Sequence, residues 1–497
     1  RSLYLEASLN YARSFGNHSV TGLLLYQQSQ KNYIGSSATS SNAALPYRHQ
    51  GVAFRATYNY DSRYFAEFNA GYNGSENFSP GHRFGFFPSV AGGWLVSNEK
   101  FWTGRLADVI SLLKIKGSYG IVGNDQIGGN RRFIYLETIN SGDKWSFGET
   151  VTSYPSYRRG EWANDNVGWE KSRKLDVGVD VSFFDKLRVQ VDWFKEKRSG
   201  IFLQRSSIPE YIGITTKPYV NIGRMRNSGW DSSLQYDQKI GQVNFSAMGN
   251  FTFARNVIED QDQPDYIEKY MNRTGQARWQ TFGYVSDGLF KDEADIATSP
   301  DQSALGEVRP GDIKYKDLNN DGVIDSKDVK AIGYTDVPEI VYGFGVSAQW
   351  KGFDVSVFFQ GNAHVSFSIN SSMVRGFTEP KMAANNVFSD IYGNYWTESN
   401  TDAKYPRLTT TEATNNNQSS DFWLVNGRYI RLKNAEFGYT FPKRLIQKMR
   451  LSQLRVFVSG TNLLTFAPFK LWDPDLQTGA SNYPNTRVAN IGLNIGF

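Results

Sequence analysis

Apolar and polar residues alternate with a period of two over long stretches of this chain. Between residues 174 and 183, every odd-numbered residue is Leu, Val or Phe, and every even-numbered residue is Lys, Asp, Gly or Ser. The same alternation recurs in 187–193, 243–253 and 353–360. Because successive side chains of a β-strand point to opposite faces, the pattern predicts strands with one apolar and one polar face.

We predict about 15 such strands, many of them near the ~10 residues that a tilted membrane-spanning strand needs. Their expected ranges are 3–13, 17–28, 50–61, 63–75, 84–96, 111–120, 173–184, 187–198, 228–238, 243–254, 338–350, 352–364, 430–441, 453–465 and 485–497. The predicted fold class is therefore all-β.

The lengths of the connections distinguish two all-β architectures. In a soluble sandwich the apolar face of each strand would point into a core, whereas in an outer-membrane barrel it would point at lipid. Tight turns such as YDSR and FDKL alternate with longer connections, including 121–172, 255–337 and 365–429. Such alternation is typical of bacterial barrels, so the sequence favours a transmembrane antiparallel β-barrel with long extracellular loops and short periplasmic turns.

The two ends of the chain add to this interpretation. The last predicted strand has apolar residues at every second position from Ala489 and ends on Phe497, which resembles the signal that the outer-membrane assembly machinery recognises. With an odd number of strands, the first and last would meet in parallel, whereas bacterial barrels close antiparallel with even numbers. Since the chain begins directly in a strand-like pattern at Arg1, we expect an incomplete barrel whose first strands are missing.

Composition agrees with a barrel and removes several other classes. Aromatic residues make up 15% of the 497 residues, and the mean hydropathy is −0.48. No apolar run approaches the ~18 residues of a transmembrane helix, and no signal peptide is visible. Cysteine is absent, which excludes disulfides and thiolate chemistry, and a net charge of +5 does not indicate nucleic-acid binding. No G-x-S-x-G motif or P-loop occurs, so we do not expect an enzyme.

Seven segments carry motifs in a characteristic order along the chain. They are 51–94, 112–128 (LLKIKGSYGIVGNDQIG), 166–184 (NVGWEKSRKLDVGVDVSFF), 283–290 (GYVSDGLF), 311–325 (GDIKYKDLNNDGVID), 427–443 (GRYIRLKNAEFGYTFPK) and 454–466 (LRVFVSGTNLLTF). Together these segments resemble the SusC/RagA family of TonB-dependent outer-membrane transporters, and they cover nearly the whole chain.

The resemblance implies a barrel of about 22 strands, plugged by an N-terminal domain. Residues 1–497 would form the C-terminal part of this barrel, and the plug, the TonB-contacting segment and the first strands would lie outside the chain. The resemblance also implies a location in the bacterial outer membrane, in contact with its lipid, and a SusD-like surface lipoprotein that covers the external loops.

Three functions stay open at this point. The first is import of oligosaccharides, powered through TonB and aided by the SusD-like lipoprotein. The second is import of peptides by the same kind of machine. The third is a structural barrel subunit of a larger envelope complex, without transport.

The stretch DLNNDGVIDSKD, residues 317–328, resembles a calcium-binding EF-hand loop. The oxygen ligands would come from Asp317, Asn319, Asp321, the carbonyl of Val323, Asp325 and Asp328. Asp in place of Glu at the last position predicts modest affinity. We expect a structural calcium ion that holds one turn of the extracellular loop 255–337. The alternative is a solvated acidic turn whose charge nearby lysines partly offset.

Aromatic residues of the long connections are candidates for substrate contact, because external loops carry function on a rigid scaffold. They are Trp145, Trp162, Tyr211, Tyr266, Trp279, Tyr392, Tyr395 and Trp396. Flat rings beside Asn, Asp and Arg suit glycans, since a ring stacks on the apolar face of a sugar. The competing interpretation is that these rings pack loops together or form the interface with the lid. The asparagine-rich stretch 409–420 is interpreted as a flexible loop.

Overall fold

The structure is a computed structural model, and it describes residues 1–32, 45–127, 131–149, 151–214, 216–375, 377, 387–479 and 482–497. The strands of these residues form one 15-stranded antiparallel sheet and five two-stranded sheets. In the large sheet the strands follow one another in chain order, as successive hairpins do. Each of the 15 predicted ranges overlaps one of these strands, so the predicted strands and their order are confirmed.

The chain divides into two compact units, 1–231 with 256–264 and 232–255 with 265–497. The division passes through β13 (Tyr219–Ile240) and β14 (Val243–Asp260). The other large-sheet strands of the first unit are β1 (Ser2–Phe15), β2 (His18–Lys31), β3 (Tyr47–Tyr60), β4 (Tyr64–Ser75), β5 (Phe84–Leu95), β6 (Ile110–Asn124), β11 (Glu170–Phe183) and β12 (Leu187–Gln204). Those of the second unit are β19 (Ile340–Trp350), β20 (Phe353–Ala363), β23 (Tyr429–Thr440), β24 (Gln453–Phe466) and β25 (Val488–Gly496).

Short elements occupy the connections. The small strands are β7 (Ile139–Ser141), β8 (Trp145–Phe147), β9 (Thr152–Tyr154), β10 (Tyr157–Arg159), β15 (Phe282–Gly283), β16 (Ser286–Leu289), β17 (Ile313–Tyr315), β18 (Lys330–Ala331), β21 (Ser366–Ser368) and β22 (Leu424–Asn426). The α-helices are α1 (Arg105–Val109), α2 (Glu293–Thr298), α3 (Ser372–Arg375) and α4 (Lys443–Ile446). The 3-10 helices are η2 (Val96–Asn98), η3 (Glu210–Ile212), η4 (Lys269–Met271), η5 (Ser303–Leu305), η6 (Ser326–Asp328), η8 (Thr414–Asn417), η9 (Asp421–Trp423), η10 (Gln447–Met449) and η11 (Pro474–Leu476). Among the described residues, no helix has the length and apolar character needed to cross a membrane.

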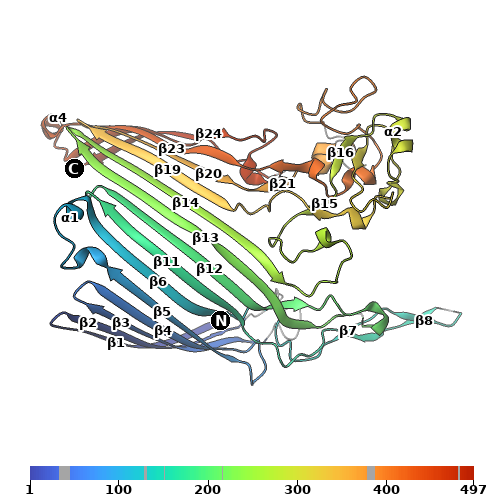
Figure 1. Cartoon of the computed structure of the whole chain (residues 1–497), viewed down its shortest axis with the longest axis horizontal. Helices are drawn as coiled ribbons and strands as arrows, with labels where there is room; N and C mark the ends of the chain where they lie inside the picture. The colour runs from blue at the N-terminus through green and yellow to red at the C-terminus, as the bar shows by residue number, and fades with distance from the viewer. Residues whose placement is uncertain are drawn as a thin grey trace. The chain divides into compact units, whose positions relative to one another are not determined.

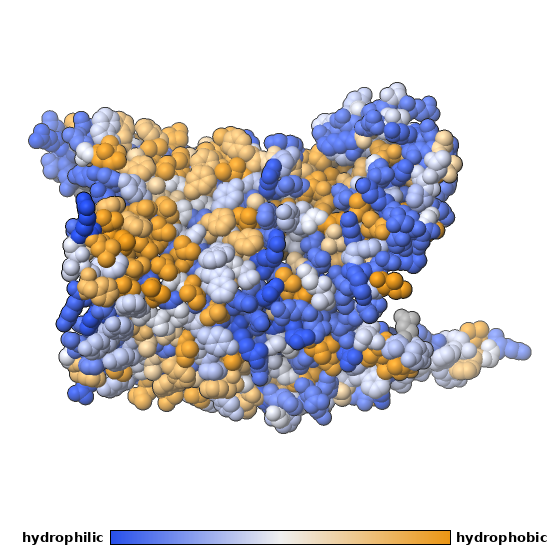
Figure 2. All heavy atoms as spheres, in the orientation of Figure 1, coloured by the Kyte–Doolittle hydropathy of each residue, from blue (hydrophilic) through white to orange (hydrophobic). Residues whose placement is uncertain are grey.

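The apolar face of the strands is an exposed surface. In the β11–β12 hairpin, Val177 pairs with Trp193 and Val179 with Val191. Val177 is 45% exposed, and in Figure 2 such apolar side chains form orange areas over the strands. Water-soluble surfaces rarely carry contiguous apolar patches larger than a few hundred Å², so this face suits lipid.

The buried cores lie mainly in the long connections. In the first unit a small cluster is formed by Phe78, Ile127, Ile134, Val167 and Phe202. In the second unit a larger cluster joins three long loops. The connection between β6 and β11 also carries the small strands β7 to β10, and in Figure 1 their hairpins project beyond the ends of β11 and β12. The strands therefore support the long connections, and most of the buried apolar packing lies in those connections.

Candidate functional site

Three long connections of the second unit, 265–339, 364–428 and 467–487, pack together into one folded region, which we call the loop cluster. Its buried core consists of Tyr284, Leu289, Ile313, Tyr315, Ile324, Phe367, Ile369, Val374, Ile391, Tyr405, Trp423 and Phe469. In Figure 1 this region lies around β15, β16, β21 and α2. Backbone hydrogen bonds from Tyr284 N–H to Ser419 O (2.9 Å) and from Asp421 N–H to Tyr284 O (3.1 Å) join the first connection to the second.

A buried polar network fixes the same two connections to each other. The side chain of Asp312 is fully buried and accepts hydrogen bonds from Asn416 Nδ2 at 2.8 Å and Arg407 Nη2 at 3.3 Å. Asn416 Oδ1 accepts the Ile313 N–H at 2.8 Å, and Asn415 Nδ2 donates to Ile313 O at 2.8 Å. A buried carboxylate requires such partners, because an unpaired charge in a protein interior is costly. The interpretation of 409–420 as a flexible loop was wrong for Asn415 and Asn416, since both are buried and hydrogen-bonded.

The acidic turn 317–328 is attached to this core by its one strongly apolar buried side chain. Ile324 is fully buried in the loop cluster, and its N–H donates to Asp301 O at 2.8 Å. Gly322 has φ +86, a left-handed conformation that glycine adopts without strain. The sharp turn that the EF-hand resemblance required is therefore present.

Side-chain oxygens of the turn already accept backbone N–H groups. The two carboxylate oxygens of Asp317 accept from Asn320 and Gly322, each at 2.7 Å. Asp328 is fully buried, and its oxygens accept from Leu318 at 2.7 Å and Asp325 at 2.9 Å. These bonds preform the turn from its own residues.

Lys327 supplies a positive charge inside the turn. Its Nζ lies 3.2 Å from Asp321 Oδ2 and 3.5 Å from Asp325 Oδ2. A hydrogen bond from Asn319, the Val323 N–H and Lys327 hold the pKa of Asp321 below its usual value. The hydrogen bond to Asp321 in turn raises the pKa of Lys327.

The pKa of Tyr270, which lies outside the turn, depends in part on the negative charge of the turn. Its hydroxyl donates to Lys327 O at 2.8 Å. Burial, followed by the negative charges of Glu268, Asp328, Asp317 and Asp321, raises the pKa of Tyr270 to about 12. Burial and, after it, the nearby negative charges thus make ionisation of this phenol less favourable.

The ligand types of the acidic turn suit a calcium ion, but the positions of these ligands suit it less well. Carboxylate, amide and carbonyl oxygens are the ligands that calcium takes, and each carboxylate oxygen can accept more than one partner. Within the described ranges, however, no group of three or more His, Asp or Glu side chains is gathered closely enough to hold a metal ion. An ion at 317–328 would have to draw the carboxylates inward and replace Lys327 as their counter-charge.

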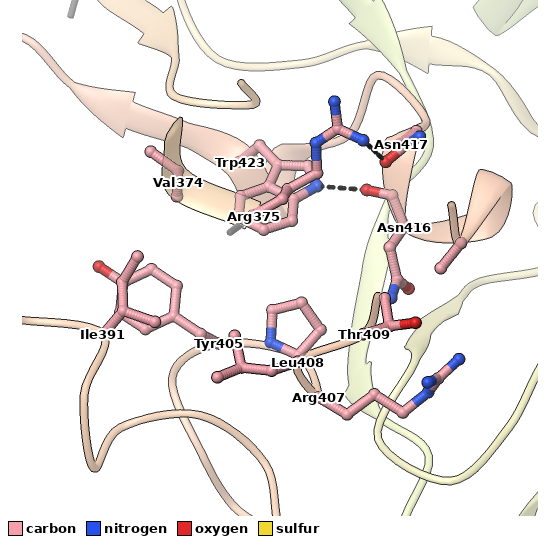
Figure 3. Close-up of a pocket in the computed structure, with 12 residues that line it drawn as sticks. Val374, Arg375, Ile391, Tyr405, Arg407, Leu408, Thr409, Asn416, Asn417 and Trp423 are labelled. Carbon is pink, nitrogen blue, oxygen red and sulfur yellow. Dashed lines mark hydrogen bonds between the residues drawn. The ribbon is translucent and has the colours of Figure 1, made fainter. Parts of the chain in front are cut away.

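The cavity in Figure 3 is a packed junction of the loop cluster. It has a volume of about 20 Å³, which holds about one water molecule. Trp423 Nε1 donates to Asn416 O at 2.8 Å beside it, and Arg375 donates to Asn417 Oδ1. The space is too small for a sugar or a peptide.

Two larger pockets of the loop cluster share Phe469 and Lys470. The first has about 310 Å³ and is lined by Asp390, Lys404 and Tyr405 among others. Asp390 accepts hydrogen bonds from Lys404 Nζ and Tyr405 Oη, both at 2.7 Å, and these partners lower its pKa. Charged groups beside aromatic rings in a pocket of this size can bind a polar ligand.

The second pocket has about 300 Å³ and is lined in part by Trp472, Asn485 and Arg487. Arg431, which is 1% exposed, anchors it by ion pairs to Asp473 at 2.5 Å and Asp475 at 2.6 Å. The residues of both pockets could not be found from the sequence, because they come from the connections 364–428 and 467–487 and from the strands β23 and β24, which no short pattern links. The Trp-Asp-Pro-Asp run at 472–475 is a local signal that could have pointed to the second pocket.

Five of the predicted aromatic residues lie in the second unit. Tyr395 and Trp396 pack against the core of the loop cluster, which leaves less of their rings for a ligand. Trp279 is 65% exposed, with the Arg278 guanidinium 4.4 Å from its ring centroid, and Tyr392 is 76% exposed. Tyr266 is half-buried. The structure therefore separates packing residues from residues that a ligand can reach.

The other three predicted aromatic residues lie in the first unit. Trp145 pairs with Tyr154 across the β8–β9 hairpin and is 64% exposed. Tyr211 is 90% exposed in η3, and Trp162 is half-buried with the Arg159 guanidinium 4.2 Å from its ring centroid. Contact with substrate stays a prediction for all eight residues.

Comparison with known proteins gives relatives that extend over nearly the whole chain. TonB-dependent receptor P3 of Formosa agariphila is 28% identical over 99% of this chain and 52% of its own length. TonB-dependent receptor SusC of Bacteroides thetaiotaomicron is 26% identical over 89% of this chain and 43% of its own length. The chain thus spans about half the length of the curated relatives it matches. No protein-family model matches it.

Solved structures show the same fold. The RagAB peptide importer in its open-open state superposes with a TM-score of 0.75 and 20% identity, over 100% of this chain and 54% of that one. A further RagAB peptide transporter structure gives 0.74 and 21% identity. These matches confirm the resemblance to SusC/RagA TonB-dependent receptors, an antiparallel outer-membrane β-barrel fold and an outer-membrane location. Such receptors are transport proteins and not enzymes, in agreement with the sequence prediction.

Proposed function

We propose that this chain forms part of the barrel of a TonB-dependent importer that takes up oligosaccharides with the help of a SusD-like surface lipoprotein. The observation that carries the transport function is the similarity to SusC and other TonB-dependent receptors over 89–99% of the chain. TonB would act through a segment outside residues 1–497.

Glycans are favoured as cargo by the kind of side chain in the loops. Trp279 and Tyr392 expose aromatic rings, and the pocket of about 300 Å³ combines the indole of Trp472 with the amide of Asn485. A ring stacks on the apolar face of a sugar, and planar amides exchange hydrogen bonds with its hydroxyls. Peptide import is the second candidate, since the RagAB structures with TM-scores of 0.74–0.75 are named as a peptide transporter and importer.

The β8–β9 hairpin supports the proposal of a protein lid. A two-stranded hairpin alone is at best marginally stable in water. Here Trp145 and Phe147 expose 64% and 61% of their surface, and Tyr157 on β10 exposes 74%. Burial of these rings against a surface lipoprotein would give them the apolar environment that their own unit does not supply.

Calcium at the acidic turn is part of this proposal as a structural ion. Asp317, Asn319, Asp321, Asp325 and Asp328 would bind it by side-chain oxygens, and Val323 by its carbonyl. The ion would neutralise the turn and hold it against the core through Ile324. No transport step depends on it.

The cargo is tested with the complete receptor and its partner lipoprotein, purified in detergent. Calorimetry against a panel of oligosaccharides and a panel of peptides should give saturable heat for glycans. The double variant Trp279→Ala with Tyr392→Ala should weaken binding at least tenfold, whereas Phe101→Ala, another exposed ring, should not. Binding of peptides alone would establish the second candidate. Binding of neither cargo, with the partner attached, would contradict import.

A further inference from the structure

An unusual group of cations lies on the lipid-facing side of the β11–β12 hairpin. Odd-numbered residues of both strands form this side, as the exposed Val177 and Val191 show. The same side carries Lys171, Arg173, Lys195 and Lys197, which we call the basic cluster. Lys171, Arg173 and Lys197 are exposed and Lys195 is half-buried.

The positions within the hairpin bring these four charges together. Arg173 lies directly opposite Lys197. Lys171 comes two residues before Arg173, opposite Ser199 and away from the short turn, and Lys195 comes two residues before Lys197, opposite Leu175 and toward the short turn. Opposite residues on one face of an antiparallel pair have Cβ atoms roughly 5 Å apart, and like charges there destabilise the pair. The cluster therefore carries an unfavourable repulsion that an anion between the strands would relieve.

Carboxylates of the two strands do not serve as this anion. Every Asp and Glu of β11 and β12, namely Glu170, Asp176, Asp180, Asp192 and Glu196, has an even number and lies on the opposite face. Among the described residues, the ion pairs of this hairpin, such as Lys116 with Asp180 and Asp192, are on that face too. None of the four cations of the basic cluster forms an ion pair with a described residue.

The distance of the basic cluster from the short turn indicates its depth in the membrane. The Arg173–Lys197 pair lies ten residues (173 to 183) from the Phe183–Leu187 pair at the short turn. Ten residues span about 34 Å along a strand, and a tilt of about 40° reduces this to roughly 26 Å along the membrane normal. The apolar band of an outer-membrane barrel is ~25 Å tall. The cluster thus lies at the upper edge of the band, on the side of the long external loops.

The residues below the basic cluster agree with this position. Trp193 lies two residues from Lys195 toward the short turn, on the same face, and Val177, Val179 and Val191 follow. Aromatic residues at the interface and aliphatic residues within the band are the usual arrangement. On the neighbouring strand β6, the residue opposite Arg173 is the apolar Ile121, so β6 adds no cation beside Arg173. In Figure 2 the orange surface over these strands gives way to blue toward the loop end.

We propose that the basic cluster binds the phosphate groups of an anionic lipid of the external leaflet. The guanidinium of Arg173 can form paired hydrogen bonds to one phosphate, and the three lysines neutralise the remaining charge. The acyl chains of that lipid lie along the valines below. The site depends only on the outer-membrane barrel, so it holds whichever cargo the receptor imports.

The experiment measures lipid retained by the complete receptor, purified in a neutral detergent, by native mass spectrometry. The probes are a bis-phosphorylated diglucosamine lipid and the same lipid without phosphates. The test variant is K171Q/R173Q/K197Q. The matched control K443Q/R444Q/K448Q removes the same residue types from exposed positions in and after α4, at a short turn. Folding is verified by the shift in gel mobility on heating in SDS.

Wild type and control should retain the phosphorylated lipid at least tenfold better than the other probe, and the test variant should lose this preference. K171R/K197R, which keeps the charge, should retain it. Equal retention by the test variant and the control would overturn the proposal. So would displacement of the lipid by equimolar inorganic phosphate, because a lipid would then not be required. Loss of a co-purifying protein with unchanged lipid would assign the cluster to a protein contact instead.

Discussion

The strands and the loop cluster of the second unit place the same residue types in opposite environments. Phe344 and Val346 on β19 are 44% and 43% exposed, whereas Phe367 and Val374 in the loop cluster are each 2% exposed. On the strands, apolar residues alternate with polar ones along the backbone, and the partner of the apolar face is lipid. In the loops, apolar residues follow no period and meet residues from connections far apart in the chain. Burial by protein therefore stabilises the loop cluster, and burial by lipid stabilises the strands of the same unit.

The largest expected effect is the loss of the loop core without loss of the barrel. Trp423 is fully buried among the three loops, and Trp423→Ala should cost the loop cluster about 3–5 kcal/mol. Limited proteolysis should cut 265–339 and 364–428 much faster in this variant, while the SDS gel shift on heating stays unchanged. Phe437→Ala, on the exposed face of β23, is the control and should not speed cleavage. If Trp423→Ala abolished the gel shift, loop cluster and sheet would be one cooperative unit.

The converse change tests the strands. Val346 on β19 points to the lipid side, and Ser347, the next residue, points to the other. Val346→Lys should lower the free energy of unfolding in lipid bilayers by about 2–4 kcal/mol, because it places a charge in the apolar band. Ser347→Lys should cost much less, since its side chain faces the polar side. Equal costs in denaturant titrations of the two variants would show that the faces are assigned wrongly.

The contrast also explains how much could be predicted from the sequence. Strand alternation is a local property, so all 15 strands of the large sheet were found, and only the ends differed, as in β13, which begins at Tyr219 instead of 228. The barrel class followed from connection lengths. The five small sheets and the loop cluster were not foreseen, because their contacts join residues such as Asp312 and Asn416 that no short pattern connects.

Some features of the candidate site could also be predicted from the sequence, and others could not. The acidic turn was visible as a motif, and its turn geometry at Gly322 is as predicted. The position of Lys327 between Asp321 and Asp325 was not predicted, because it depends on a side-chain rotamer. Tyr395 and Trp396 could not be separated from Trp279 and Tyr392 in the sequence, since burial in a loop depends on partners from other loops.

Calcium should act on the loop cluster and leave the strands unaffected. If calcium replaces Lys327 as the counter-charge, Lys327→Ala should raise calcium affinity severalfold, as removal of one competing exposed charge does. Lys316→Ala is the control, because its Nζ pairs with Asp287 at 3.5 Å, outside the turn. Calorimetric titration of the complete receptor with calcium measures both. Equal affinities would show that Lys327 does not compete, and no heat in either would remove the calcium site.

The smallest expected effect is a shift in the ionisation of Tyr270. Its pKa is raised to about 12, above the ordinary value of about 10, so the native protein holds this proton more tightly than the unfolded chain does. The associated stability is fully present below pH ~10 and is lost as the pH rises toward 12. Calcium at 317–328 would offset the charges of Asp317, Asp321 and Asp328 and bring the pKa of Tyr270 down. The phenolate absorbance of wild type minus Tyr270→Phe, titrated with and without calcium, should show this shift. The far-ultraviolet circular dichroism of the strands should be the same with and without calcium. Identical phenolate curves would place any bound calcium away from this turn.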